Sequence, residues 1–383
     1  MAFNLDEKIL KFLEENQEQT LLLTEQISKI PAPSGKEERR AEFVKNWLEG
    51  AGAKGVCIDG ALNVVYKIDG KDSDDIIAFI AHTDTVFPDT EYPMPFSRDD
   101  KYLYSPGVGD DTVCLAIMLM VVKYIVENNL KPSLSILFAA NSCEEGLGNL
   151  KGVKQLMKDY GDKVKTLYTF DGTYRHLVNK CVGSHRYKIT FETEGGHSFN
   201  NFGNRNAIYA MSQLINSLYA CKVPVNGDSV TTYNVGIVDG GTSVNTIAQN
   251  ASMLYEYRSD DKECLSYMQN FFNCQIEEFK KKNLATINVE LIGDRPCGGD
   301  VDKDELKKIS DKVVGICEKH TGIPCKCESG STDANIPMSL GIPAVCVGVY
   351  MGSGAHTREE TVEIASVPKG LKIAAELILE YFD

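Results

Sequence analysis

The stretch Ser133-Leu-Ser-Ile-Leu-Phe-Ala-Ala-Asn141-Ser-Cys-Glu144-Glu145 decides the fold, because a buried strand ends there in two adjacent acids. Its largely apolar run is typical of a strand that is covered on both faces of a sheet. Adjacent carboxylates repel each other, and burying them is costly unless a positive charge lies beside them. A metal ion meets that condition, with one carboxylate as ligand and the other free for proton transfer. Two surface acids in a loop are the alternative.

Helices and strands alternate along the N-terminal part of the chain. We expect helices at residues 5–30, 34–50, 112–127 and 152–160, and strands at residues 63–67, 76–81, 135–140 and 166–170. Ser34 is expected to cap the second helix, with Glu37 as its capping-box partner. The alternation predicts an α/β fold, with a mostly parallel sheet and helices on both faces.

The pattern changes at about Cys181. Strands are expected at residues 185–193, 231–238, 252–257 and 286–291, and helices at residues 205–219 and 262–282. Their order, β-α-β-β-α-β, is that of a ferredoxin-like α+β domain. After Asp294 the α/β pattern resumes with a helix at 302–320, a strand at 344–349 and a terminal helix. The sequence therefore predicts a discontinuous domain of residues 1–181 and 294–383, with an inserted domain of residues 182–293.

Charge and cysteine usage restrict the setting in which the protein works. A net charge of −14 over 383 residues argues against binding to nucleic acid or to an anionic membrane. The first residues lack the basic and then apolar layout of a signal peptide. Twelve scattered cysteines favour reduced thiols. We expect a cytoplasmic globular protein.

A second apolar run, residues 76–81, ends in His82-Thr-Asp84. Residues two apart on a strand point to the same side, so Asp84 can accept a hydrogen bond from one imidazole nitrogen of His82. The other nitrogen is then left for a metal. Active sites of open α/β sheets lie at the carboxyl ends of strands, where this pair is expected. A polar strand end without further role is the alternative.

Gly107-Val-Gly109-Asp110-Asp111 precedes an apolar helix. A glycine-rich turn there can bind phosphate at the helix N-terminus. However, the third glycine of a dinucleotide fingerprint is missing, and two acids occupy the place of the anion. The acids favour a cation. In the simpler interpretation, Asp111 is only the N-cap of the helix.

Six candidate residues come from five separate segments: His82, Asp110, Glu144, Glu145, Asp171 and His356. Two imidazoles with several carboxylates suit zinc, or else manganese or cobalt. Two dications offset by three ligand carboxylates and one hydroxide would be formally neutral, with one acid left as a base. That balance favours a hydrolytic site with two metal ions.

With these motifs the sequence resembles the dinuclear-zinc peptidase family that includes peptidase T, glutamate carboxypeptidase, acetylornithine deacetylase and succinyl-diaminopimelate desuccinylase. The resemblance covers nearly the whole chain. It rests on motifs in the family's order: His82-Thr-Asp84-Thr, Gly109-Asp110-Asp111, Glu144-Glu145, Gly196-His197-Ser and His356.

The resemblance implies five ligands for two divalent metal ions, namely His82, Asp110, Glu145, Asp171 and His356. Asp110 would bridge the two ions, and its peptide bond to Asp111 would be cis. Glu145 would complete the site that contains His82, and Asp171 would complete the site that contains His356. Zinc is the expected metal, with cobalt or manganese as alternatives.

The resemblance also implies catalytic and substrate-binding roles. Glu144 would be the general base, taking a proton from the water that bridges the metal ions and later donating it to the leaving amine. Asp84 would orient the first histidine. In the inserted domain, which would serve as a lid and as the contact of a homodimer, His197 would help polarise the scissile carbonyl, from the partner subunit if the chain dimerises. Asn245 and Arg258 would contact substrate, and Arg258 can hold a carboxylate bidentately.

Two features point to the peptidase T branch: the segment Gly330-Ser-Thr-Asp333-Ala-Asn335 followed by Gly341-Ile-Pro343, and an aspartate at position 171 where deacylases and glutamate carboxypeptidase usually carry glutamate. Two others depart from the family, because Thr112 replaces a common lysine and residues 200–203 replace a pattern of small residues and proline. We therefore expect an aminopeptidase that acts on di- and tripeptides. The alternatives are a deacylase of N-acyl amino acids and, more remotely, a non-catalytic binding protein that retains the fold.

Overall fold

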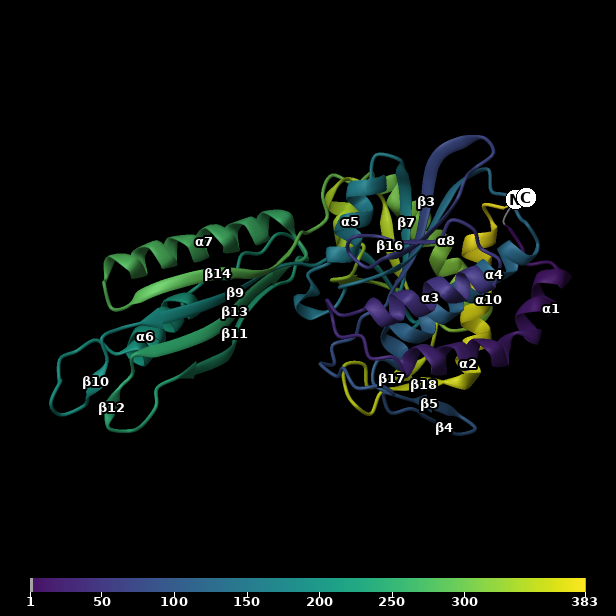
Figure 1. The fold of residues 1–383 in the computed structure, drawn as a ribbon. Helices are drawn as coiled ribbons and strands as arrows, with labels where there is room; N and C mark the ends of the chain where they lie inside the picture. Colours follow the sequence, from purple (N-terminus) through teal and green to yellow (C-terminus); the bar gives the residue numbers. More distant parts are fainter. Residues whose placement is uncertain (1–2, 383) are drawn as a thin grey trace. The chain divides into compact units, whose positions relative to one another are not determined.

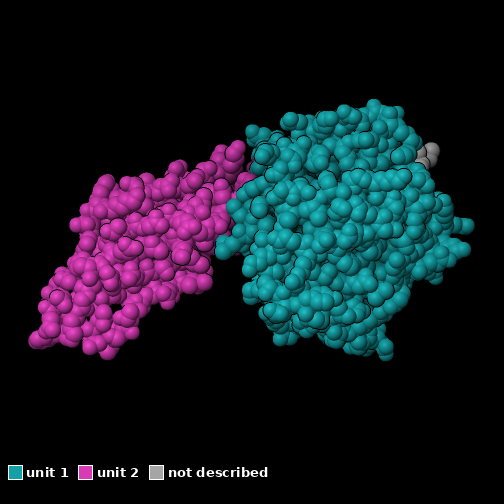
Figure 2. Space-filling view, in the orientation of Figure 1, with its two compact units in different colours: residues 1–180, 300–383 teal, residues 181–299 magenta. Residues whose placement is uncertain are grey.

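The computed structural model describes residues 3–382, which divide into two compact units. The first unit contains the chain up to residue 180 and from residue 300 onward, and the second contains residues 181–299 (Figure 2). Each unit has a hydrophobic core of its own.

An eight-stranded sheet forms the centre of the first unit, in the order β1-β2-β6-β3-β7-β16-β8-β15. Figure 1 labels three of its strands, β3, β7 and β16. The four middle strands of the sheet, β6, β3, β7 and β16, run parallel to one another, whereas β1 with β2, β2 with β6 and β8 with β16 pair antiparallel. The strands are β1 (Cys57–Ile58), β2 (Val64–Ile68), β3 (Ser73–His82), β6 (Leu134–Asn141), β7 (Val164–Phe170), β8 (His176–Cys181), β15 (Lys326–Gly330) and β16 (Ala344–Val347). The predicted α/β fold is confirmed.

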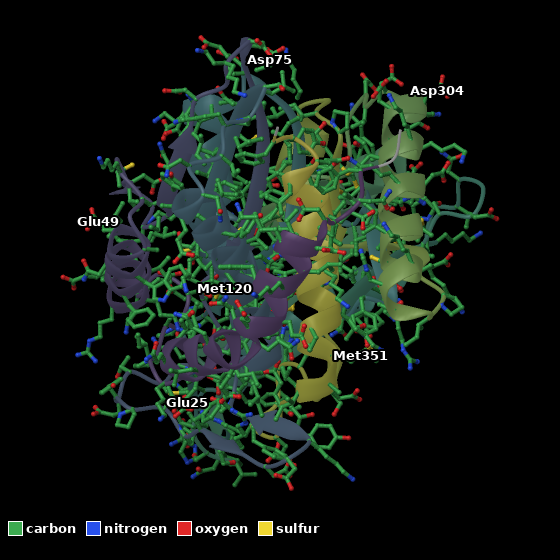
Figure 3. All side chains as sticks on the ribbon, turned by 90° about the vertical axis from the view of Figure 1, so that its right-hand side faces the viewer. Glu25, Glu49, Asp75, Met120, Asp304 and Met351 are labelled. Atoms are coloured by element: carbon green, nitrogen blue, oxygen red, sulfur yellow. The ribbon has the colours of Figure 1, made fainter. Side chains whose placement is uncertain are left out.

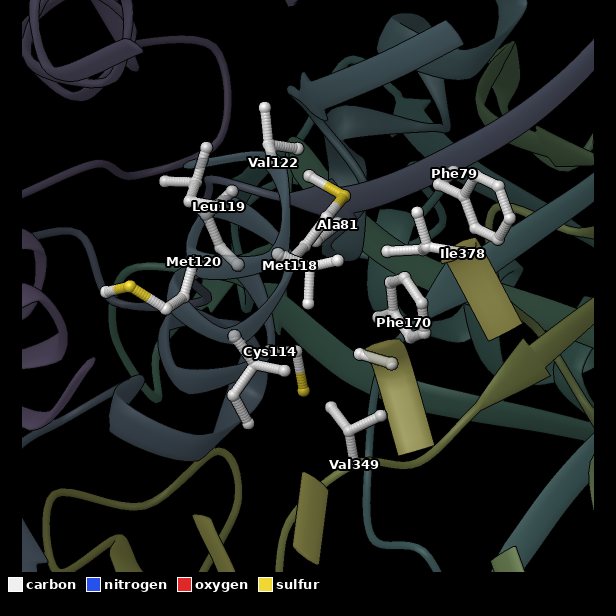
Figure 4. Packing of buried hydrophobic residues seen from close by; sticks show 14 of the residues in the cluster. Phe79, Ala81, Cys114, Met118, Leu119, Met120, Val122, Phe170, Val349 and Ile378 are labelled. Carbon is white, nitrogen blue, oxygen red and sulfur yellow. The ribbon is translucent and has the colours of Figure 1, made fainter. Parts of the chain in front are cut away.

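Both faces of the middle strands are buried. Phe79 and Ala81 of β3 join the main hydrophobic core, in which helix α4 packs (Figure 4). Ala78 and Ile80 point to the opposite face and are equally inaccessible to solvent. Such two-sided burial explains why the strand is apolar throughout. Figure 3 shows Glu49, Asp75 and Asp304 at the edge of this unit.

The helices of the first unit are α1 (Glu7–Glu15), α2 (Gln17–Ser28), α3 (Glu38–Gly50), α4 (Cys114–Glu127), α5 (Lys151–Tyr160), α8 (Lys303–Thr321), α9 (Asn335–Ser339) and α10 (Val367–Leu379). Helix α10 contacts α1, α2, α4 and α8, while α5 packs against α9. A small sheet of β4 (Ser97–Arg98), β5 (Tyr102–Tyr104), β17 (Gly352–Ser353) and β18 (Thr361–Glu363) completes the unit.

The prediction of a single helix at residues 5–30 is wrong, because two helices, α1 and α2, are separated at Asn16. The Asn16 amide donates a hydrogen bond to the carbonyl of Phe12 at 2.8 Å, and its oxygen accepts one from Lys123 at 3.1 Å. Asparagine competes in this way with the helical hydrogen bonds of the backbone. The hydrophobic periodicity continues across the break and therefore conceals it.

The second unit follows the predicted β-α-β-β-α-β order. Its elements are β9 (Gly183–Glu192), α6 (Ala207–Tyr219), β11 (Thr231–Gly240), β13 (Asn250–Ser259), α7 (Lys262–Lys281) and β14 (Thr286–Arg295). The antiparallel sheet has the order β11-β13-β9-β14, and both helices pack against it. The ferredoxin-like insertion is confirmed. A short ribbon of β10 (Gly196–His197) and β12 (Thr246–Ile247) extends from it.

Across residues 3–382, no helix combines the length and apolar character needed to cross a membrane. All twelve cysteines lie within these residues, and none of them forms a disulfide bond.

Candidate metal centre

Three neighbouring parallel strands bring candidate residues to one edge of the sheet. His82 is the last residue of β3 and pairs with Asn141, the last residue of β6. Glu144 and Glu145 follow β6, and Asp171 follows β7 on the other side of β3. The carboxyl ends of these strands are where a site is expected in an open α/β sheet.

Two loops supply the remaining candidates. Asp110 belongs to an irregular helical turn, Val108–Val113, that leads into α4. His356 lies between β17 and β18, in the left-handed backbone region with φ of 65°. A residue other than glycine is uncommon in that region and, where it occurs, often marks a functional site.

Asp110 lies between the two histidines. Its Oδ1 atom is 3.0 Å from Nε2 of His82, and its Oδ2 atom is 3.0 Å from Nε2 of His356. Nε2 of His356 is also 3.0 Å from Oε1 of Glu145. One carboxylate facing two imidazoles is the arrangement expected of a ligand shared by two metal ions.

Potential ligand atoms form two groups that share Asp110, each within 4.8 Å: His82, Asp110 and Asp171, and Asp110, Glu145 and His356. Asp171 is thus grouped with His82 rather than with His356, whereas Glu145 is grouped with His356 here and with His82 in a further group. Asp171 follows β7 and Glu145 lies in the turn beyond β6, so both flank His82 at the end of β3, and Glu145 also reaches His356.

Glu144 lies beside the ligand groups. Its carboxylate forms a third group within 4.8 Å with an imidazole nitrogen of His82 and the carboxylate of Glu145, and the residue is 6 % exposed. Cys143, directly before it, has a left-handed backbone with φ of 58°. The two adjacent acids thus both lie near His82, and Glu145 also contacts His356.

Asp84 supports the turn that carries the two acids. Its carboxylate accepts hydrogen bonds from the amide N–H groups of Glu144 and Glu145, both at 2.9 Å, and from the Ser34 hydroxyl at 2.6 Å. Nδ1 of His82 is closer to the Asp84 backbone oxygen, at 3.1 Å, than to its carboxylate, at 3.5 Å. Asp84 therefore fixes the imidazole mainly through its carbonyl group.

The prediction of a capping box at Ser34 and Glu37 is wrong. Helix α3 begins at Glu38, and neither side chain caps this helix. Oε1 of Glu37 instead accepts a hydrogen bond from the Cys143 amide at 3.0 Å. Both side chains therefore turn toward the Glu144 segment. The long-range contact cannot be distinguished from a capping box in the local sequence.

Behind the site lies a buried arginine that the sequence reasoning missed. Arg40 donates to the carbonyl oxygens of Ile30 at 2.7 Å and Thr83 at 2.9 Å, and to the Thr112 hydroxyl at 3.3 Å. Burial lowers the pKa of its guanidinium to about 10. Thr112, the position at which many family members carry lysine, thus faces a cation from another part of the chain.

Asp111 is not a helix N-cap, contrary to the simpler interpretation, because α4 begins only at Cys114. Its Oδ2 atom accepts a hydrogen bond from the His82 amide at 2.9 Å. The peptide bond between Asp110 and Asp111 is cis, as the resemblance implied.

Negative charge dominates the cluster. Hydrogen bonds that the His356 imidazole donates to the Asp110 and Glu145 carboxylates raise its pKa to about 11. Burial, together with the Asp110 charge, raises the pKa of Asp171 to about 7. The two raised pKa values mean that His356 and Asp171 retain protons more readily than usual, because carboxylates outnumber positive charges around them. Divalent ions would supply the missing positive charge, and the histidine and carboxylate donors suit zinc.

The candidate residues of the second unit fall at opposite ends of its sheet. His197 and Asn245 meet at the ribbon, where the Ser198 amide donates to the Asn245 carbonyl at 3.0 Å. Arg258 pairs with Ser184 at the other end of β9, a strand about 30 Å long at ~3.3 Å per residue. Its guanidinium makes two 3.0 Å hydrogen bonds to Glu256.

A sequence model of peptidase family M20/M25/M40 matches residues 78–380, and the chain belongs to this family. It is accordingly a hydrolase of the M20 peptidase class, with candidate metal-ligand groups at the strand ends. The segment that holds Ser34, Glu37 and Arg40 lies outside the matched range.

The chain is similar to hydrolases with different named activities. The chain is 23 % identical to succinyl-diaminopimelate desuccinylase of Corynebacterium glutamicum, over 94 % of this chain and 96 % of the relative. Aminopeptidase PepT of Bacillus cereus has a similar fold, with a TM-score of 0.73, 23 % identity and coverage of 96 % and 99 %. A dinuclear metal-binding M20 peptidase of Bacillus subtilis aligns with a TM-score of 0.63 at 16 % identity, covering 96 % and 99 %.

Proposed function

We propose that this chain is a metal-dependent aminopeptidase that removes the N-terminal residue from di- and tripeptides. The observation that carries the proposal is the pair of ligand groups sharing Asp110, with the Glu144 carboxylate beside them. Such a pair of sites is suited to hydrolysis.

Two divalent ions held by these residues would polarise the scissile carbonyl and make a water molecule acidic at neutral pH. Glu144 would accept a proton from that water on a carboxylate oxygen and pass it to the leaving amine. Asp84 would keep Glu144 in reach of the reaction, because it holds the Glu144 amide. Asp110 and the two histidines would keep the ligand groups together.

Two observations support the peptidase over the deacylase. Asp171 and the Gly330–Asn335 segment match the peptidase T branch, and Asp333 of that segment accepts a hydrogen bond from Asn141, at the end of β6, at 2.6 Å. The relatives named desuccinylase favour the alternative, a deacylase of N-acyl amino acids with the same chemistry.

We also propose that two copies of the chain associate through the second unit. Strand β11 is an edge of its sheet, and Ile237 and Val238 on it are exposed. An exposed apolar edge strand is suited to pairing with another strand. A small peptide cannot reach both His197 and Arg258 of one chain, so if both contact one substrate they would come from different copies, and we assign the carbonyl-polarising imidazole to His197 of the partner subunit.

A substrate panel tests the activity. Trialanine and dialanine with free N-termini should release alanine in the presence of zinc, cobalt or manganese, whereas N-acetylalanine and N-succinylalanine should not be hydrolysed. Amino-acid analysis of the products at matched enzyme concentration measures both. Turnover of the acylated substrates alone would overturn the peptidase assignment in favour of the deacylase.

Replacing Glu144 tests the proton transfer. Glu144→Gln keeps the shape of the side chain but removes the base, so kcat should fall by about 10²–10⁴-fold. Metal content, measured by elemental analysis, should stay that of the parent protein. Glu359→Gln, at an exposed acid, is the matched control and should keep parental kcat. Parental activity in Glu144→Gln would remove this residue from the mechanism.

Sedimentation equilibrium tests the association. The parent protein should have twice the 42.3 kDa mass of one chain. Ile237→Lys should shift it to the mass of a single chain, because charged edge strands resist pairing. Leu340→Lys, at an exposed leucine of the first unit, serves as control and should remain dimeric. A monomeric parent, or a dimeric Ile237→Lys variant, would contradict the proposal.

A further inference from the structure

Glu360 carries a buried carboxylate that none of the roles above uses. The residue is 1 % exposed and directly precedes β18. Its carboxylate accepts three backbone hydrogen bonds, from the amides of Gly107 at 2.6 Å, Gly109 at 3.0 Å and Asp110 at 2.8 Å. Burying a carboxylate is costly, and several N–H donors offset that cost. The three backbone amides thus bind the Glu360 carboxylate in one defined orientation.

These three amides belong to the loop that presents Asp110, the ligand shared by both groups. Gly107 has a left-handed backbone with φ of 73°. A Cβ atom at Gly109 would lie 2.5 Å from the Tyr350 hydroxyl oxygen, so a larger residue there would force Tyr350 or the loop to shift. A loop with two glycines has little stiffness of its own. The shape of the loop therefore depends on the contacts around it. One of these contacts is the hydrogen bond that Glu360 accepts from the backbone amide of Asp110 itself.

Glu360 also belongs to the segment that presents the second histidine. His356 is four residues earlier, in the loop between β17 and β18. The Glu360 carbonyl accepts a further bond from the Ser105 amide at 3.3 Å, just before the glycine loop. One residue therefore ties the loop of Asp110 to the loop of His356. The 3.0 Å contact between Asp110 and His356 spans these two loops.

We propose that Glu360 is a positioning residue that holds Asp110 and His356 at the spacing needed to bind metal. It touches neither substrate nor metal and acts through the backbone of its neighbours. The inference rests on the metal centre of the proposed function, but not on the identity of the substrate. Supporting groups behind metal ligands typically change metal affinity by about 10–100-fold when they are replaced.

Glu360→Gln tests the inference, with Glu359→Gln as the matched control at the exposed neighbouring acid. The amide NH₂ of glutamine would face backbone N–H donors, so the loop should move away. Zinc affinity, measured on the purified full chain by competition with a chromophoric chelator, should fall by about 10–100-fold in Glu360→Gln. It should be unchanged in Glu359→Gln. The visible spectrum of the cobalt-loaded protein should also change only in Glu360→Gln.

A purely structural role would lower the melting temperature of metal-free Glu360→Gln while leaving zinc affinity and the cobalt spectrum at parental values. That result would overturn the inference. If Glu360→Gln does not fold, Glu360→Asp decides, because it retains the charge but is too short to reach all three amides. Weakened zinc binding by folded Glu360→Asp supports the inference, and parental binding overturns it. Since no substrate is involved, a protein that binds zinc normally but cleaves no peptide would count only against the proposed function.

Discussion

Buried carboxylates, held in place by backbone N–H groups, are the constraint on which the rest of this structure depends. The Asp84 carboxylate accepts hydrogen bonds from the backbone amides of Glu144 and Glu145. The Glu360 carboxylate accepts hydrogen bonds from backbone amides of the loop that carries Asp110. The free-energy cost of desolvating each carboxylate is thus partly offset by hydrogen bonds from backbone N–H groups that are fixed in place. The side chains of Asp110, Glu144 and Glu145 are consequently fixed close together, although they repel one another.

Much of the fold could be predicted from the sequence because the middle strands are apolar on both faces. Runs such as residues 76–81 leave few alternatives to a covered parallel strand. Once the strands are parallel, their carboxyl ends share one edge, and His82, Glu145 and Asp171 come together without any long-range information. The ferredoxin-like insertion was equally accessible, because its order of elements is characteristic.

Other features depend on lateral order and on distant contacts, which local patterns do not contain. Both β6 and β7 flank β3, so the sequence alone does not tell which acid accompanies which histidine. Glu37 satisfies the spacing of a capping box but contacts Cys143. Glu360 had no local signal, because its three partners lie about 250 residues earlier in the chain.

The central claim is that the cluster lacks positive charge and that two divalent ions supply it. Calorimetric titration of the metal-free chain with zinc, in two buffers of different ionisation enthalpy near pH 7, tests it most directly. His356, with a pKa raised to about 11, holds a proton that it must lose to bind metal, so affinity should increase with pH. The account predicts two ions per chain and a net release of protons. Saturation at a single ion, or binding without proton release, would contradict it.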